Sequence, residues 1–243
     1  MPEFRPFTAT EAKTYIEDFL GRRVTVSIDI EAEWYQSGQQ DFSLYEGEEY
    51  LIYLLKGHAE SRDHTTLAVR YLRELGLAPS SLIDCGTGLG FFAATLAIDF
   101  PRCRVVATNV DGLQLEFNTW LFERLRLSNL EVREASRAEG TFDAILALEY
   151  FEHFKRPAEE LRRLAEQYRP KTLVESSSFS HKAMGHFDEY EIGGATYVGP
   201  KEGGGAGSAY RQFTKSIAIV GFQSFPLKSN GWTHGRPRIW RAP

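Results

Sequence analysis

From residue 81 onward the chain alternates short apolar runs with stretches that repeat apolar residues at helical spacing. Apolar runs of four to seven residues are typical of buried strands, and the helical stretches between them are typical of crossover helices. The predicted strands are Leu82–Cys85, Arg104–Thr108, Leu130–Arg133, Phe142–Leu148 and Thr172–Glu175, and the predicted helices are Phe91–Phe100, Leu113–Leu125 and Pro157–Tyr168. This order predicts an α/β fold with a doubly wound, mostly parallel sheet.

The rhythm changes after the fifth predicted strand. Residues 176–208 form a long connection rich in glycine and hydroxyl groups, which is typical either of a functional lid or of a disordered segment. A helix is then predicted over Tyr210–Val220, ending at Gly221, followed by strands over Gln223–Lys228 and Arg236–Arg241. We therefore expect a helix and a hairpin to complete the sheet.

The first 57 residues do not follow the alternation. They predict an amphipathic helix over Ala9–Leu20, a strand over Val24–Ile30 and a helix over Glu48–Leu55, and a further helix over Thr65–Leu75 leads into the first strand of the sheet. Because residues 1–57 hold too few apolar side chains for a core of their own, we interpret them as a cap on a core of residues 58–243.

Composition narrows the classes of function. The 243 residues carry a formal net charge of −5 and no dense run of Lys and Arg, which disfavours indiscriminate nucleic-acid binding. No apolar run is long enough for a membrane span, and no signal peptide is apparent. The two cysteines, Cys85 and Cys103, fall in or beside predicted buried strands and suggest no disulfide framework, so a cytoplasmic protein is expected.

The most informative motif is the turn that follows the first predicted strand. Asp84 is followed by glycines at 86, 88 and 90, and then by the apolar start of a helix. Glycine permits a tight turn and a close approach of the backbone to a ligand, and the new helix offers free N–H groups. Dinucleotide-binding turns usually space their glycines as G-x-G-x-x-G, whereas Phe91 occupies the sixth place here.

Three segments together resemble the class I S-adenosylmethionine-dependent methyltransferases. They are the turn Asp84–Gly90, the fourth strand with its trailing Glu-His (Phe142–His153), and the spacing of the second strand, and the resemblance extends from about Arg62 to the C-terminus. It implies a Rossmann-like methyltransferase fold of seven strands, the last one antiparallel, and S-adenosylmethionine as cofactor. It also implies that Asp84, Gly86, Thr87, Gly88 and Gly90 bind this cofactor.

Two positions depart from the family pattern. Where the family usually places an acid for the ribose hydroxyls, this chain has Asn109, with Asp111 two residues later. A carboxylate accepts two hydrogen bonds, whereas an amide has one acceptor and one donor group. Either residue is therefore a candidate for the ribose, and a chain that has lost cofactor binding is the alternative. Ser136 replaces the acid that often takes the adenine amino group, and Arg62 is a candidate for the cofactor carboxylate.

Candidate catalytic residues follow the fourth strand. Glu149, Tyr150, Glu152 and His153 come where ligands bind in open α/β sheets, and Glu149 is expected to meet the cofactor as well. Histidine suits general-base work near neutral pH, although Glu152 and His153 equally suit a structural role at the next helix. The spacing of His58, His64, His181 and His186 matches no standard set of metal ligands, so no metal is expected.

We expect a methyltransferase that acts on an oxygen or nitrogen atom of a small molecule, since the chain is acidic. A nucleic-acid or nucleotide methyltransferase is the first alternative, and it requires five basic residues to converge: Lys182, Lys201, Arg236, Arg238 and Arg241. The sequence Leu148-Glu149-Tyr150-Phe151 stands where base methyltransferases have Asn/Asp-Pro-Pro-Tyr. A non-catalytic binding subunit, suggested by Asn109, is the second alternative. The sequence fixes no oligomeric state.

Overall fold

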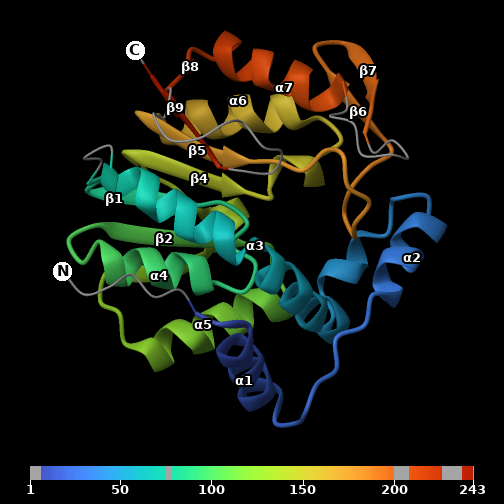
Figure 1. Cartoon of the computed structure of the whole chain (residues 1–243), viewed down its shortest axis with the longest axis vertical. Helices are drawn as coiled ribbons and strands as arrows, with labels where there is room; N and C mark the ends of the chain where they lie inside the picture. Colours follow the sequence, from blue (N-terminus) through green and yellow to red (C-terminus); the bar gives the residue numbers. More distant parts are fainter. Residues whose placement is uncertain (1–6, 75–77, 200–207, 226–236, 243) are drawn as a thin grey trace. The chain divides into compact units, whose positions relative to one another are not determined.

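The structure, a computed structural model, describes residues 7–74, 78–199, 208–225 and 237–242, and within the long third helix it leaves the side chains of residues 59–67, 70, 71 and 74 undescribed. The chain divides into two compact units, which are shown in Figure 1. The first unit comprises residues 1–30 and 41–138, and the second comprises residues 31–40 and 139–243. Each unit is described separately.

The first unit holds three parallel strands in the order β3-β2-β1: β1 (Ser81–Asp84), β2 (Arg104–Asn109) and β3 (Leu130–Glu134). Helices α4 (Phe91–Asp99) and α5 (Leu113–Leu125) pack on β2 and β3, and the short helix η2 (Ala135–Arg137) follows β3. The predicted strands and helices of this region are thus confirmed to within a residue at most ends. In strand register Asp84 lies beside Ala107, so the carboxyl ends of β1 and β2 are neighbours.

The N-terminal helices of the first unit pack on its core through aromatic rings. Helix α1 (Ala9–Leu20) begins with a capping box between Thr8 and Glu11 and lies against α3 (Glu48–Glu74) and α5. The rings of Phe19 and Phe117 meet at 5.3 Å between centroids, and those of Phe7 and Phe91 at 5.1 Å. A short helix, η1 (Phe42–Tyr45), precedes α3. The predicted helix Ala9–Leu20 is confirmed with the same bounds.

Two predictions for the N-terminal segment were wrong. Val24–Ile30 is not a strand: residues 24–28 are irregular, and α2 (Asp29–Gln36) begins at residue 29. Val26 and Ile28 are 40% and 55% exposed, so the apolar side chains of this alternating segment are not buried against a sheet. The helices predicted over Glu48–Leu55 and Thr65–Leu75 are one continuous helix, α3, because Gly57 alone does not break it. The expected boundary after residue 57 therefore falls within this helix.

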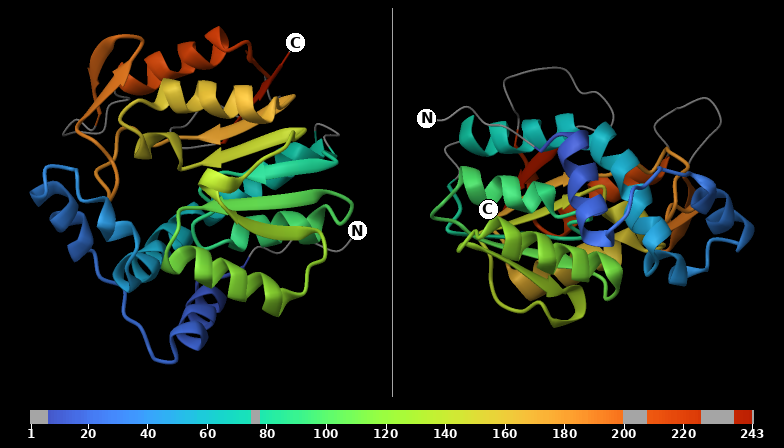
Figure 2. Two further views of the ribbon diagram at one scale, coloured as in Figure 1. Left: turned by 180° about the vertical axis from the view of Figure 1, so that it is seen from behind. Right: turned by 90° about the horizontal axis from the view of Figure 1, so that it is seen from below.

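The second unit holds four further strands in the order β4-β5-β9-β8. β4 (Ala144–Leu148) and β5 (Thr172–Ser176) are parallel, whereas β9 (Arg238–Arg241) runs antiparallel to both β5 and β8 (Gln223–Ser224). Helices α6 (Pro157–Tyr168) and α7 (Ser208–Ile219) lie side by side, as the left view in Figure 2 shows. A short helix, η3 (Phe151–His153), follows β4, and α2 belongs largely to this unit.

The described part of the connection after β5, for which the sequence left a functional lid or a disordered segment open, contains secondary structure. It contains a two-stranded hairpin of β6 (Glu189–Ile192) and β7 (Ala195–Val198), turned by Gly193 and Gly194 at φ of 61° and 81°. The hairpin packs on α6 and α7. Lys201, Arg236 and the end of the strand predicted over Gln223–Lys228 lie outside the described residues.

The predicted fold class is confirmed: the strands form a mostly parallel seven-stranded sheet, flanked by helices, in which β9 runs antiparallel to its neighbours. None of the described helices is both long and apolar enough to cross a bilayer.

Candidate active site

The glycine turn of the first unit has the backbone that its sequence predicts. Gly86, Gly88 and Gly90 have φ angles of 64°, 55° and 77°, in the left-handed region that glycine adopts without strain. A Cβ atom on Gly90 would lie 2.9 Å from both Asn118 Nδ2 and Phe122 Cε1, so only glycine fits between the turn and α5. A Cβ on Gly88 would meet nothing within 4 Å, so open space lies beside the turn at this position.

Hydrogen bonds made by Asp84 and Thr87 stabilise the turn. The Thr87 hydroxyl donates to Asp84 Oδ2 at 2.6 Å, and the Thr87 N–H donates to the carbonyl of Thr108 at 2.9 Å. The Thr108 hydroxyl in turn donates to the Asp84 carbonyl at 3.2 Å. Burial raises the pKa of the Asp84 carboxyl to about 7, against which the bond from Thr87 acts. These contacts join β1 and β2 at the carboxyl edge of the sheet.

The buried Asn109 side chain connects the turn to α5 through hydrogen bonds. Its Nδ2 donates to the Gly88 carbonyl and to Asn118 Oδ1, both at 3.1 Å, and its Oδ1 accepts from the Val110 N–H at 3.1 Å. Asn118 Nδ2 also donates to the Gly88 carbonyl, at 3.1 Å. A carboxylate at position 109 has no hydrogen to donate to either acceptor. The amide is therefore required by the packing of this turn.

Asp111 lies exposed just beyond β2, where its Oδ1 accepts from the Gly112 N–H at 3.0 Å. The N-terminal segment borders this position, because Gln114 Nε2 donates to the Tyr45 carbonyl at 2.8 Å and Gly112 lies against Glu46. The exposed Ser136, on η2, is hydrogen-bonded to Glu134.

The remaining polar group singled out in the sequence lies on α3. Arg62 and His64 are on this helix, and their side chains are outside the described part of the chain. His58, one turn earlier, has Nε2 3.1 Å from the Phe7 carbonyl and its ring 5.2 Å from that of Phe91. His58 thus takes part in packing of the first unit.

In the second unit Glu149 has an unusual backbone. Its φ is 49°, a conformation that side chains other than Asn, Asp and Gly rarely adopt. Its N–H donates to the Ser176 carbonyl at 2.6 Å, and its Oε1 accepts from the Ser176 hydroxyl at 2.7 Å. Both contacts lie at the carboxyl ends of β4 and β5. Such strain is characteristic of functional sites, where surrounding contacts hold it in place.

Glu152, His153 and His186 gather beside Glu149. The rings of His153 and His186 meet edge to face, with 4.9 Å between centroids. Burial, together with the neighbouring His186, lowers the pKa of His153 to about 3, and burial also lowers that of His186. His153 is therefore neutral near pH 7 and a weak proton acceptor there.

The Tyr150 hydroxyl is hydrogen-bonded to helix α6. Its hydroxyl donates to Glu160 Oε1 on α6 at 2.7 Å, and the same carboxylate is paired with Arg163. The structure thus brings Glu149, Glu152 and His153 together and directs the Tyr150 hydroxyl to α6. Sequence reasoning missed Thr108, Asn118, Ser176 and the approach of His186 to His153, because none of these has a motif of its own.

The arginines of the last strand are engaged within the second unit. The Arg238 guanidinium lies 4.5 Å from the centroid of the Tyr210 ring, and that of Arg241 lies 4.4 Å from the centroid of the Phe225 ring.

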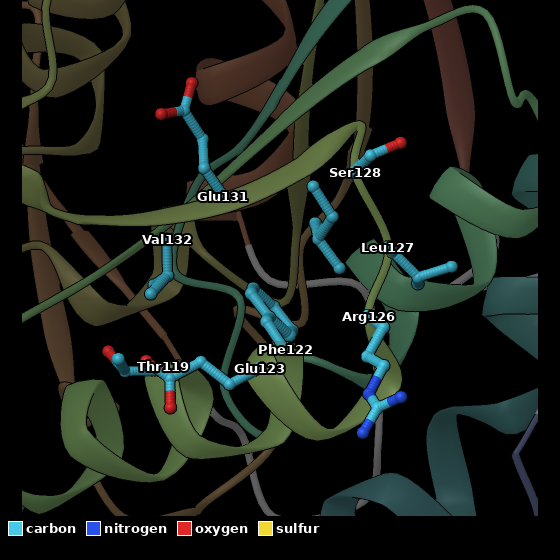
Figure 3. Close-up of a pocket in the computed structure, with 9 residues that line it drawn as sticks. Thr119, Phe122, Glu123, Arg126, Leu127, Ser128, Glu131 and Val132 are labelled. Atoms are coloured by element: carbon cyan, nitrogen blue, oxygen red, sulfur yellow. The ribbon is translucent and has the colours of Figure 1, made fainter.

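A pocket of about 450 Å³ lies in the first unit between α5 and β3, as Figure 3 shows. It includes Leu130 at the amino end of β3, so it lies at the end of the strand opposite to the glycine turn.

Comparison with known proteins identifies the family. The sequence model described as "Methyltransferase domain" matches residues 59–194. (S)-Coclaurine N-methyltransferase from Thalictrum flavum subsp. glaucum is 27% identical over 154 residues, covering 58% of this chain and 41% of that protein. The chain thus matches less than half the length of that relative.

Solved structures show the same fold. The N-terminal domain of EvdMO1 with SAH bound has a TM-score of 0.55 at 14% identity, covering 76% of this chain and 84% of that chain. Magnesium protoporphyrin IX methyltransferase (ChlM) from Synechocystis PCC 6803, with bound SAM, has a TM-score of 0.50 at 18% identity, covering 94% and 95%. The glycine turn, the sheet and the matched domain agree, and the chain belongs to the family of class I S-adenosylmethionine-dependent methyltransferases.

Proposed function

We propose that this chain transfers a methyl group from S-adenosylmethionine to an oxygen or nitrogen atom of a small-molecule acceptor. The observation that carries the proposal is the turn Asp84–Gly90, with its three left-handed glycines and the open space beside Gly88, within a chain of this family. Ligands of open α/β sheets bind outside the carboxyl ends of the strands, and both this turn and Glu149 follow such an end.

The turn fits the proposed cofactor. Gly86, Gly88 and Gly90 would let the cofactor approach the backbone closely, while Asp84 and Thr87 keep the turn in shape. Asp111 is the better candidate for the ribose hydroxyls, because it is exposed. The side-chain N–H groups of Asn109, in contrast, are already donated to acceptors inside the protein. Ser136 for the adenine and Arg62 for the cofactor carboxylate complete the proposed set.

Catalysis would consist mainly of positioning. S-adenosylmethionine supplies an electrophilic methyl group on its sulfonium, and transfer requires in-line alignment with the acceptor atom. We assign the acceptor to the side of Glu149, Tyr150 and His153. Glu149 is held in a strained conformation by two bonds to Ser176, which fixes its carboxylate for an acceptor or cofactor contact. The Tyr150 ring would contribute a surface, since its hydroxyl is bonded to Glu160.

A small acceptor is supported by charge and by similarity. The net charge of −5 does not favour a polyanionic substrate, and Arg238 and Arg241 stack on rings of their own unit. The curated relative is named for N-methylation of (S)-coclaurine. Residues 1–57 would act as the cap, since Tyr45 and Glu46 already border the turn that carries Asp111.

Two measurements test this function. Calorimetric titration with S-adenosylhomocysteine should show one site per chain, and no binding at millimolar ligand would refute the proposed cofactor site. A screen of small amines, phenols and carboxylic acids, read out as S-adenosylhomocysteine released, should then identify the acceptor class. Cofactor binding with turnover only on RNA or DNA would refute the small-molecule acceptor.

A further inference from the structure

Three potential metal ligands meet in the second unit. Glu152 and His153 lie on η3, after β4, and His186 lies in the connection after β5. Each offers one ligand atom, and these atoms lie within 4.8 Å of one another. Ligands bound about 2 Å from a zinc ion are about 3–4 Å apart, so small rotations of the side chains would suffice to enclose a cation.

His186 is oriented as metal-binding histidines usually are. Its Nδ1 lies 2.8 Å from the His181 carbonyl, which makes Nδ1 the protonated nitrogen and leaves Nε2 with its lone pair. A hydrogen bond from the other ring nitrogen to a carbonyl is the usual outer contact of a histidine ligand. The backbone is fixed as well, because the Trp34 indole donates to the His186 carbonyl at 2.7 Å.

Glu152 supplies a second, independent observation. Its side chain is fully buried, and Oε1 accepts from the Ser178 N–H at 2.9 Å. Oε2 is also buried and has no hydrogen-bond donor among the described residues. A buried carboxylate oxygen without a donor is costly unless a cation or a proton compensates it.

We propose that Glu152, His153 and His186 bind a divalent transition-metal ion, with Zn²⁺ as the representative. Two imidazoles and a carboxylate suit Zn²⁺ and its first-row neighbours better than Mg²⁺ or Ca²⁺. Three protein ligands leave one coordination position open, as in catalytic rather than structural zinc sites. That position would take water or an acceptor oxygen. Only this last consequence rests on the proposed methyltransferase function, since binding of the cation does not require the cofactor.

The test is calorimetric titration of the metal-stripped full chain with Zn²⁺, in parallel with S-adenosylhomocysteine. The wild type should bind one Zn²⁺ per chain. His186→Asn retains a donor for the His181 carbonyl but lacks Nε2, and Glu152→Gln retains an acceptor for Ser178, and each should weaken Zn²⁺ binding about 100-fold or more. Glu175→Gln is the matched control. Glu175 is equally buried in the same unit, and its Oε2 likewise has no donor among the described residues, while its Oε1 accepts from Tyr210 and Trp240. It belongs to no cluster of metal ligands in the described part of the chain, so this variant should bind Zn²⁺ like the wild type.

Absence of Zn²⁺ binding in the wild type overturns the proposal, and so does wild-type affinity in either ligand variant. An equal loss of Zn²⁺ affinity in Glu175→Gln overturns the proposal too, because the loss would then arise from removing a buried charge and not from removing a ligand. If a ligand variant fails to fold, Co²⁺ added to the wild type decides. Visible absorption bands of a four- or five-coordinate ion support the site, and an unchanged aqueous Co²⁺ spectrum refutes it. Binding of S-adenosylhomocysteine alone would leave the proposed cofactor site standing while the metal site fails.

Discussion

The buried Asp84 should make the stability of the chain depend on pH, and Asp84→Asn should remove this dependence. Burial raises the pKa of this carboxyl from 3.8 to about 7. Between these values the native chain holds a proton that the unfolded chain has released, so the free energy of unfolding falls as pH rises. One pKa unit is worth about 1.4 kcal/mol, and the whole shift therefore amounts to about 4 kcal/mol.

Most of that loss, about 3 kcal/mol, falls between pH 5 and pH 8. The asparagine variant keeps an acceptor for the Thr87 hydroxyl but cannot ionise. Its stability relative to the wild type should therefore improve by about 3 kcal/mol between the two pH values, measured by urea unfolding without cofactor.

Asp111→Asn is the matched control, because it makes the same substitution at a carboxylate that is exposed rather than buried. Comparing each variant with the wild type at the same pH cancels the contributions of all other titrating groups. An equal stability difference between Asp84→Asn and the wild type at both pH values would refute the reasoning, because Asp84 would then titrate alike in the folded and unfolded chains.

Three further predictions concern the same turn. Asn109→Asp should lower the free energy of unfolding by about 1–3 kcal/mol in urea, because the Gly88 carbonyl and Asn118 Oδ1 lose a donor and a carboxylate is buried in its place. If that variant instead binds S-adenosylhomocysteine more tightly at unchanged stability, Asn109 is the ribose ligand. Asp111→Asn should weaken S-adenosylhomocysteine binding about tenfold in calorimetry with unchanged stability, as expected for the loss of one charged hydrogen bond; unchanged affinity would exclude Asp111. Gly90→Ala should cost about 1–3 kcal/mol in thermal or urea unfolding, because φ is 77° and the new methyl group meets Asn118 and Phe122 at 2.9 Å; a neutral effect would mean that α5 can move away.

Much of the fold was predictable because its strands are nearly continuous apolar runs, which leave few alternatives. Val24–Ile30 misled because alternation alone cannot say whether a neighbouring strand exists, and none of the described strands pairs with this segment. The hairpin Glu189–Val198 did carry a local signal, Gly193-Gly194 between alternating residues, but the many glycines that follow obscured it.

The candidate site was less predictable, because its roles depend on partners distant in the sequence. Whether Asn109 faces a ligand or the interior depends on Asn118, which α5 brings against the turn. As a possible metal ligand, His186 was considered with His58, His64 and His181, whereas its neighbour in space is His153. A motif identifies residues that contact a ligand directly, and it says little about residues whose role arises from packing.

The bond between Trp34 and the carbonyl of His186 also bears on how the protein matures in the cell. The two residues are 152 positions apart in the sequence. At a synthesis rate of about 5–20 residues per second, Trp34 is added to the chain on the order of 10–30 seconds before His186. During that interval the Trp34 indole lacks the hydrogen-bond partner that it has in the folded chain. The second unit can complete its fold only late in translation, so slowing elongation between these two residues should increase aggregation rather than relieve it.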